Sequence, residues 1–119
     1  MSKHRRLELT HFCLQYHEWE EAVRDLNLYP TMQRWEGKAS DLPDPTFDIS
    51  TRLSVFKSKM AMVQRAASEC DPDIGDAIFK AVTEDLAFSY FEARGIACGR
   101  DMFYDRLRKF FYLLDKIRM

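Results

Sequence analysis

The amino-acid sequence predicts an all-α protein, and three observations lead to that prediction. Apolar residues recur at alternating spacings of three and four in three separate segments, as on one face of a helix, and strict alternation never persists long enough for a strand. The 119 residues include only 4 Gly and 4 Pro, too few turn formers for a many-stranded sandwich or barrel. With 46% apolar residues, a chain of this length closes one hydrophobic core, so residues 1–119 should form a single-domain bundle of about five helices.

The first predicted helix spans residues 7–27. It should end before Pro30, because proline disfavours the α conformation in the residue that precedes it. A short helical piece over 31–36 then stops at Gly37 and completes an N-terminal helical segment, residues 7–37. The apolar stripe of the first helix consists of Leu9, Phe12, Tyr16, Trp19, Val23 and Leu26.

An extended connector is predicted for residues 38–46. Its prolines, Pro43 and Pro45, have no backbone N–H to donate, which disfavours a regular element. A long helix over 47–69 should follow, with Thr46 as its N-cap. Its apolar residues again lie three or four apart and share one face: Ile49, Leu53, Phe56, Met60, Val63, Ala67 and Cys70.

A third helix is predicted over 72–82, with Asp71 as N-cap and a proline at the first helical position. It completes the central helices, residues 47–82. Thr83 should then cap a fourth helix over 84–94.

The C-terminal region, residues 83–119, has the order helix, turn, helix. The fourth helix should end at Gly95, since glycine adopts the left-handed conformation that closes a helix. Residues 96–99 are too few for anything but a turn. A final helix over 100–117 carries the stripe Phe103, Leu107, Phe110, Leu114 and Ile117. This order predicts a helix-turn-helix unit.

Enzyme signatures are incomplete in this sequence. The spacing Glu8-x-x-His11 occurs once, whereas a carboxylate-bridged di-iron site needs two copies, and the stretch that begins at His17 lacks the second histidine of a zinc protease. There is no Gly-rich phosphate loop. We therefore expect no catalytic residue, no metal site and no cofactor, which makes an enzyme the least favoured class.

Cysteine usage and hydropathy predict a cytoplasmic protein that does not enter a membrane. The three cysteines are widely spaced and form no CxxC pair, which favours neither a disulfide framework nor a thiolate zinc site. The longest strongly apolar stretch, residues 110–114, is far shorter than the roughly 20 residues of a membrane helix. The basic N-terminus is not followed by the apolar run of a signal peptide.

Charge is distributed unevenly along the chain, although 18 basic and 19 acidic residues leave a net charge of only -1. Residues 1–6 contain three basic residues and no acidic one. Residues 94–119 contain seven basic and three acidic residues, whereas residues 7–93 contain 8 basic and 16 acidic ones. Because the basic C-terminal region coincides with the predicted helix-turn-helix, this region is the candidate for contact with nucleic acid.

In such a unit the second helix enters the major groove of DNA. Phe88 and Phe91 would pack on its apolar stripe, which leaves its opposite face for DNA. The residues predicted to face bases are Arg100, Asp101, Tyr104, Asp105 and Arg108, and those predicted to reach phosphates are Arg106, Lys109 and Lys116. The competing interpretation is an ordinary solvated helix, since the two aspartates would repel phosphate.

Residues 29–119 are similar to short proteins of phages and integrated elements of Gram-positive bacteria. They resemble the RinA and ArpU type phage transcriptional regulators, whose C-terminal part is similar to the promoter-reading helix-turn-helix of sigma factors. The resemblance is carried by Tyr29-Pro30, Asp44-Pro45-Thr46, the long helix that follows, Ile96-Ala97-Cys98-Gly99-Arg100-Asp101-Met102-Phe103-Tyr104-Asp105-Arg106 and Arg108-Lys109-Phe110-Phe111.

This resemblance implies a DNA-binding transcriptional regulator, with double-stranded DNA as its partner and RNA polymerase as a further contact. Residue matching carries DNA contact over to Arg100, Tyr104, Arg106, Arg108 and Lys109. The acidic N-terminal half is expected either to pack against the basic helix-turn-helix or to dimerise beside it, which would give a homo-oligomer. The alternative is a non-enzymatic structural or adaptor protein of phage assembly that binds protein partners.

Overall fold

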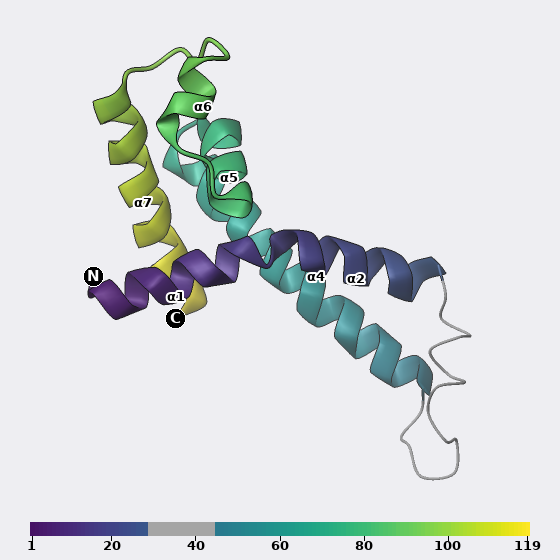
Figure 1. Cartoon of the computed structure of the whole chain (residues 1–119). Coiled ribbons are helices and arrows are strands. Elements are labelled where there is room, and N and C mark those ends of the chain that lie inside the picture. Colours follow the sequence, from purple (N-terminus) through teal and green to yellow (C-terminus); the bar gives the residue numbers. More distant parts are fainter. Residues whose placement is uncertain (29–44) are drawn as a thin grey trace. The chain divides into compact units, whose positions relative to one another are not determined.

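The computed structural model describes residues 1–28 and 45–119, which form six helices and no strand (Figure 1). This confirms the all-α prediction. The predicted helical piece over 31–36 and the connector over 38–44 lie outside the described residues. The helices are α1 (Lys3–Leu14), α2 (Tyr16–Leu28), α4 (Pro45–Cys70), α5 (Gly75–Glu84), α6 (Phe88–Glu92) and α7 (Arg100–Arg118).

The chain divides into two compact units. Unit 1 consists of residues 1–16 and 61–119, and unit 2 of residues 17–60. Unit 1 therefore contains α1, the C-terminal part of α4, and α5 to α7. Unit 2 contains most of α2 and the N-terminal part of α4.

The prediction of one continuous helix over 7–27 was wrong, because the chain forms α1 and α2 there. The backbone N–H of Gln15 donates to the carbonyl of Phe12, three residues back, at 3.3 Å, so the regular pattern of helical hydrogen bonds is interrupted. The start of α1 also lies earlier than predicted. Ser2 is its N-cap, and the hydroxyl of Ser2 accepts the backbone N–H of Arg5 at 3.1 Å.

The long predicted helix is present as α4, but it begins at Pro45. Proline suits the first helical position because its missing N–H would have no helical partner there. Thr46 therefore lies inside the helix, and its predicted role as N-cap was wrong. At the other end α4 extends through Cys70, one residue beyond the predicted end.

The turn between α4 and α5 is organised by Asp71. Its carboxylate accepts the backbone N–H of Asp73 at 2.7 Å and that of Ile74 at 3.0 Å, so it fixes this turn. Its predicted role as N-cap of the next helix was wrong, because the N-cap of α5 is Ile74. The helix α5 begins at Gly75 and not at Pro72, because residues 72–74 form a turn that precedes the helix.

Thr83 does not cap a fourth helix. It is buried inside α5, and its hydroxyl donates to the carbonyl of Phe79 at 2.9 Å. α5 continues to Glu84 and ends at Asp85, which has a left-handed φ of 57°. α6 is consequently shorter than predicted. Gly95 has the predicted left-handed conformation, with a φ of 79°.

The core of unit 1 is formed by α1, the C-terminal part of α4, α5, α6 and α7. α7 contacts α1, α5 and α6, and α1 also contacts α5. The ring centroid of Phe103 lies 5.4 Å from that of Phe88 and 5.5 Å from that of Phe91, which confirms the predicted aromatic packing of α6 on α7. The largest fully buried side chains are Phe103, Phe110, Leu9, Ile78, Leu114, Val63, Cys13 and Cys70.

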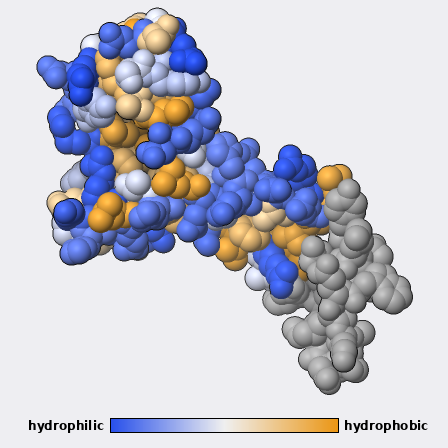
Figure 2. Space-filling view, in the orientation of Figure 1, coloured by the Kyte–Doolittle hydropathy of each residue, from blue (hydrophilic) through white to orange (hydrophobic). Residues whose placement is uncertain are grey.

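In unit 2, apolar residues are visible between α2 and the N-terminal part of α4 (Figure 2). Trp19 and Leu26 of α2 are buried, and the ammonium of Lys59 lies 5.8 Å from the centroid of the Trp19 ring. Leu28 and Val55 are exposed. The described part of unit 2 therefore has both buried and exposed apolar side chains.

Candidate nucleic-acid interface

The helix α7 has one buried face and one exposed basic face. Phe103, Phe110 and Leu114 are buried and lie seven and four residues apart, so they share the face that packs against the core. Arg108 and Lys109 are exposed on the other side of the helix. The exposed face predicted for the last helix is therefore present.

Arg100 and Tyr104 lie in the first two turns of α7. Arg100 is exposed, and its guanidinium carbon lies 5.7 Å from the centroid of the Tyr104 ring. Tyr104 is half-buried, and its hydroxyl accepts the backbone N–H of Phe88 at 3.4 Å. The Tyr104 hydroxyl is therefore engaged in joining α7 to α6.

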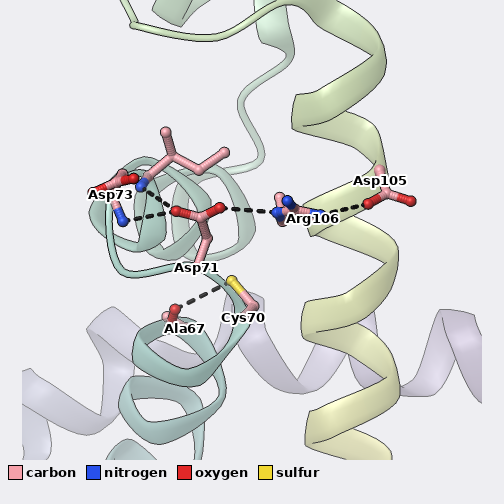
Figure 3. A network of polar contacts seen from close by, with 7 residues as sticks. Ala67, Cys70, Asp71, Asp73, Asp105 and Arg106 are labelled. Carbon is pink, nitrogen blue, oxygen red and sulfur yellow. Dashed lines mark hydrogen bonds and ion pairs between the residues drawn. The ribbon is translucent and has the colours of Figure 1, made fainter.

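Arg106 is held by two carboxylates (Figure 3). Its Nε donates to Asp71 at 2.8 Å, and its Nη1 donates to Asp105 at 2.7 Å. Asp71 is buried, and hydrogen bonds from the Ile74 backbone and then from Arg106 lower the pKa of its carboxyl group. The structure thus places Arg106 in an ion-pair network that joins α7 to the turn after α4.

The positive charges of Arg108 and Lys109 are neutralised by nearby carboxylates much less than that of Arg106. The Arg108 side chain is 67% exposed, and the carboxylate paired with it, that of Asp105, lies 3.6 Å away. Among the side chains of residues 1–28 and 49–119, no carboxylate forms an ion pair with Lys109. These two residues therefore keep most of their positive charge available at the surface.

Arg6 of α1 lies beside these residues and was not among the predicted contacts. Arg6, Arg108 and Lys109 line one cavity of about 560 Å³, which we call the basic groove. The full lining of the basic groove is Met1, Arg6, Asp105, Arg108, Lys109 and Tyr112. The guanidinium carbon of Arg6 lies 3.9 Å from the centroid of the Phe111 ring. Desolvation, and then repulsion from Arg108, lower the pKa of Arg6.

Other basic residues at the two ends of the sequence are used to hold α1 against α7. Arg5 donates to Asp115 at 2.5 Å and to Glu8 at 2.9 Å. Arg118 lies 3.8 Å from the Glu8 carboxylate, and its guanidinium carbon lies 3.9 Å from the centroid of the Phe12 ring. These pairs explain how two sequence-distant basic segments meet in one groove. The basic N-terminal run was the only sequence signal for the position of Arg6.

Thiol chemistry is not favoured at the two buried cysteines. Burial raises the pKa of Cys13 to about 12 and that of Cys70 to about 11, so both thiols are protonated at neutral pH.

In the part of the chain that the structure describes, no group of histidine, cysteine and acidic residues could hold a metal ion. No helix in that part is long and apolar enough to span a bilayer.

No protein-family model matches this chain, and neither curated proteins nor solved structures gave a significant match.

Proposed function

We propose that this protein binds double-stranded DNA and regulates transcription for a phage or another mobile element. The observation that carries the proposal is the basic groove, whose lining among the described residues contains Arg6, Arg108 and Lys109 and one carboxylate, that of Asp105. Excess positive charge at one surface attracts the phosphate backbone and supplies much of the affinity of DNA-binding proteins.

In this proposal α6, the turn over 93–99 and α7 act as the helix-turn-helix. α7 would enter the major groove, because its core-facing side is fixed by Phe103 and Phe110 while its opposite side is open. Arg100, at the exposed N-terminal end of α7, would face base edges, and Arg108 and Lys109 would contact phosphates. Arg106 would act indirectly, by fixing α7 through Asp71.

The resemblance of residues 29–119 to the RinA and ArpU type regulators supports the same function. It adds RNA polymerase as a proposed second partner. Independently of the resemblance, we propose a homo-oligomer as the assembly. In helix-turn-helix proteins, dimers place two recognition helices on half-sites about one helical turn of DNA apart.

A second candidate function is an adaptor of phage assembly that binds protein partners. The observation that favours it is that two large apolar side chains of unit 2, Leu28 and Val55, are exposed. In this proposal they would belong to an apolar patch that a partner protein covers. The adaptor would not require duplex DNA.

Replacing Arg108 with glutamate separates the two functions. We expect Arg108→Glu to weaken binding to duplex DNA by at least tenfold, because it places a negative charge beside the phosphates, and to leave helicity and melting unchanged, because the side chain is exposed. Fluorescence anisotropy with random duplex DNA, between about 50 and about 200 mM salt, measures this effect.

The matched control is Arg65→Glu, which makes the same charge change on α4. The Arg65 side chain is 65% exposed and pairs with Glu69 at 3.1 Å, outside the basic groove. Equal loss of affinity in both variants would mean that only total charge matters. Negligible binding by the wild type across the salt range would contradict the proposal and favour the adaptor.

A further inference from the structure

Arg6 and Arg108 form a pair of like charges, in which only Arg108 has a carboxylate beside it, that of Asp105 at 3.6 Å. Arg6 is half-buried, and among the described residues no carboxylate forms an ion pair with it. Desolvation and the charge of Arg108 both lower its pKa, so the folded chain holds the two cations together at an electrostatic cost. An anion bound between them would relieve that repulsion.

The guanidinium of Arg6 is also held in place before any ligand binds. It stacks on the Phe111 ring, which is itself buried and packs edge-to-face on Phe110 at 5.1 Å between ring centroids. Stacking uses the flat face of a guanidinium and leaves the N–H donors on its edge, which match the oxygens of a phosphate. A donor that is already positioned loses less side-chain entropy when it binds.

We infer that the basic groove is a phosphate-binding site, in which Arg6 of α1 joins Arg108 and Lys109 of α7 around a phosphate of the DNA backbone. This inference rests on the proposed function. It assigns to α1 a direct part in binding that a helix-turn-helix alone would not give it.

The surface beside the groove favours a strand of phosphates over an isolated anion. Tyr112, which is exposed, and Lys116 follow Arg108 on the same face of α7 at successive spacings of four residues, each about 6 Å along the helix. The ammonium of Lys116 lies 4.4 Å from the centroid of the Tyr112 ring. Positive charge thus continues along α7 beyond the groove itself.

One acidic group lies in the groove and sets a limit on its affinity. The Asp105 carboxylate interacts with Arg106 at 2.7 Å and with Arg108 at 3.6 Å. This carboxylate would repel a phosphate, and it also neutralises part of the positive charge of Arg108. Removing this carboxylate should therefore strengthen binding, an effect that a damaged fold would not produce.

The test compares Arg6→Gln, Arg6→Lys and Asp105→Asn with the control Arg65→Gln. Binding to a random duplex is measured by anisotropy as a function of salt. Loss of one phosphate contact should reduce the slope of log K against log salt by about one, so we expect that change in Arg6→Gln and not in Arg65→Gln. Arg6→Lys should keep most of the wild-type slope, and Asp105→Asn should bind severalfold more tightly.

The possible results separate this inference from the proposed function. If Arg6→Gln keeps the wild-type slope while Arg108→Glu weakens binding, the inference is overturned and DNA binding by α7 stands. If the wild type does not bind duplex DNA, both are overturned. If a polyglutamate peptide binds as tightly as the duplex, the groove is a general anion site and the assignment to backbone phosphate is wrong.

Discussion

The carboxylate of Asp71 accepts three hydrogen bonds, from the backbone of Asp73 and Ile74 and from Arg106. These bonds favour its charged form and lower its pKa in the folded protein. The sequence predicted Asp71 as the N-cap of a helix that begins at Pro72, but in the structure it holds the turn that precedes α5. Its bond to Arg106 was not predicted, because 35 residues separate the two and no local pattern indicates which basic residue reaches a buried carboxylate.

Replacing Asp71 with asparagine should destabilise the protein. Asparagine retains one oxygen for the backbone N–H groups but loses the charged bond to Arg106, so we expect a loss of about 1–2 kcal/mol in the free energy of unfolding, measured with urea at pH 7. Asp105→Asn is the matched control. Its side chain is 56% exposed, so its ion pairs should contribute less than about 0.5 kcal/mol.

The effect of Asp71→Asn should also depend on pH. Because the pKa of Asp71 is lower in the folded than in the unfolded chain, its charge stabilises the fold fully above the ordinary aspartate pKa of about 3.9, and this stabilisation is lost as the pH falls through the folded value. The difference between wild type and variant should be constant from about pH 7 to about pH 5 and shrink below about pH 4. A difference that grows on acidification would contradict this assignment.

At the scale of the helices, α4 and α5 approach each other closely at Gly75. A Cβ atom there would lie 2.7 Å from the backbone carbonyl oxygen of Ala67, a contact that only a backbone shift could relieve. Gly99, the N-cap of α7, has an extended conformation with open space around its Cα and no side chain to accept a hydrogen bond. The two glycines should therefore respond oppositely to substitution.

We expect Gly75→Ala to destabilise the protein by about 1–3 kcal/mol, as overpacking does, although alanine is otherwise the better helix former. Gly99→Ser should stabilise it by a few tenths of a kcal/mol, because serine at an N-cap accepts a backbone N–H. Thermal unfolding followed by circular dichroism measures both changes. A neutral Gly75→Ala would mean that the turn between α4 and α5 adjusts at little cost.

The helices that the sequence predicts best are those with long apolar stripes and clear ends. The predicted start of α7 at Arg100 agrees with the structure, and its predicted end differs by one residue, because its stripe is long and a glycine precedes it. The break at Gln15 and the continuation of α5 through Thr83 were missed. Each depends on which backbone carbonyl accepts a hydrogen bond, from the N–H of Gln15 in one case and from the hydroxyl of Thr83 in the other. Threonine is also a common N-cap residue, although Thr83 lies inside a helix.

At the scale of the whole chain, the sequence showed two basic ends but not that they meet. Within unit 1, α1 contacts α7, and the pairs Arg5 with Asp115 and Arg118 with Glu8 join the two helices. Which cations face the groove is decided by this packing: Arg6 lines it, whereas Arg5 is held by carboxylates. Exposure of Arg108 was predictable from helical periodicity, but the position of Arg6 depends on a contact across most of the sequence.

Because the basic groove exists only while α1 and α7 are packed together, DNA bound there should stabilise the fold. A ligand that binds only the folded state at 100 times its Kd raises the free energy of unfolding by about 2.7 kcal/mol, which for a chain of this size is roughly 10 °C in Tm. We expect duplex DNA to give such a shift at low salt and to lose it at high salt, as measured by differential scanning fluorimetry. At the same DNA concentration Arg108→Glu, whose affinity should fall at least tenfold, should show no more than about half of this shift, and Arg65→Glu nearly all of it. A wild type that binds duplex DNA by anisotropy without any rise in Tm would place the bound DNA away from the folded groove.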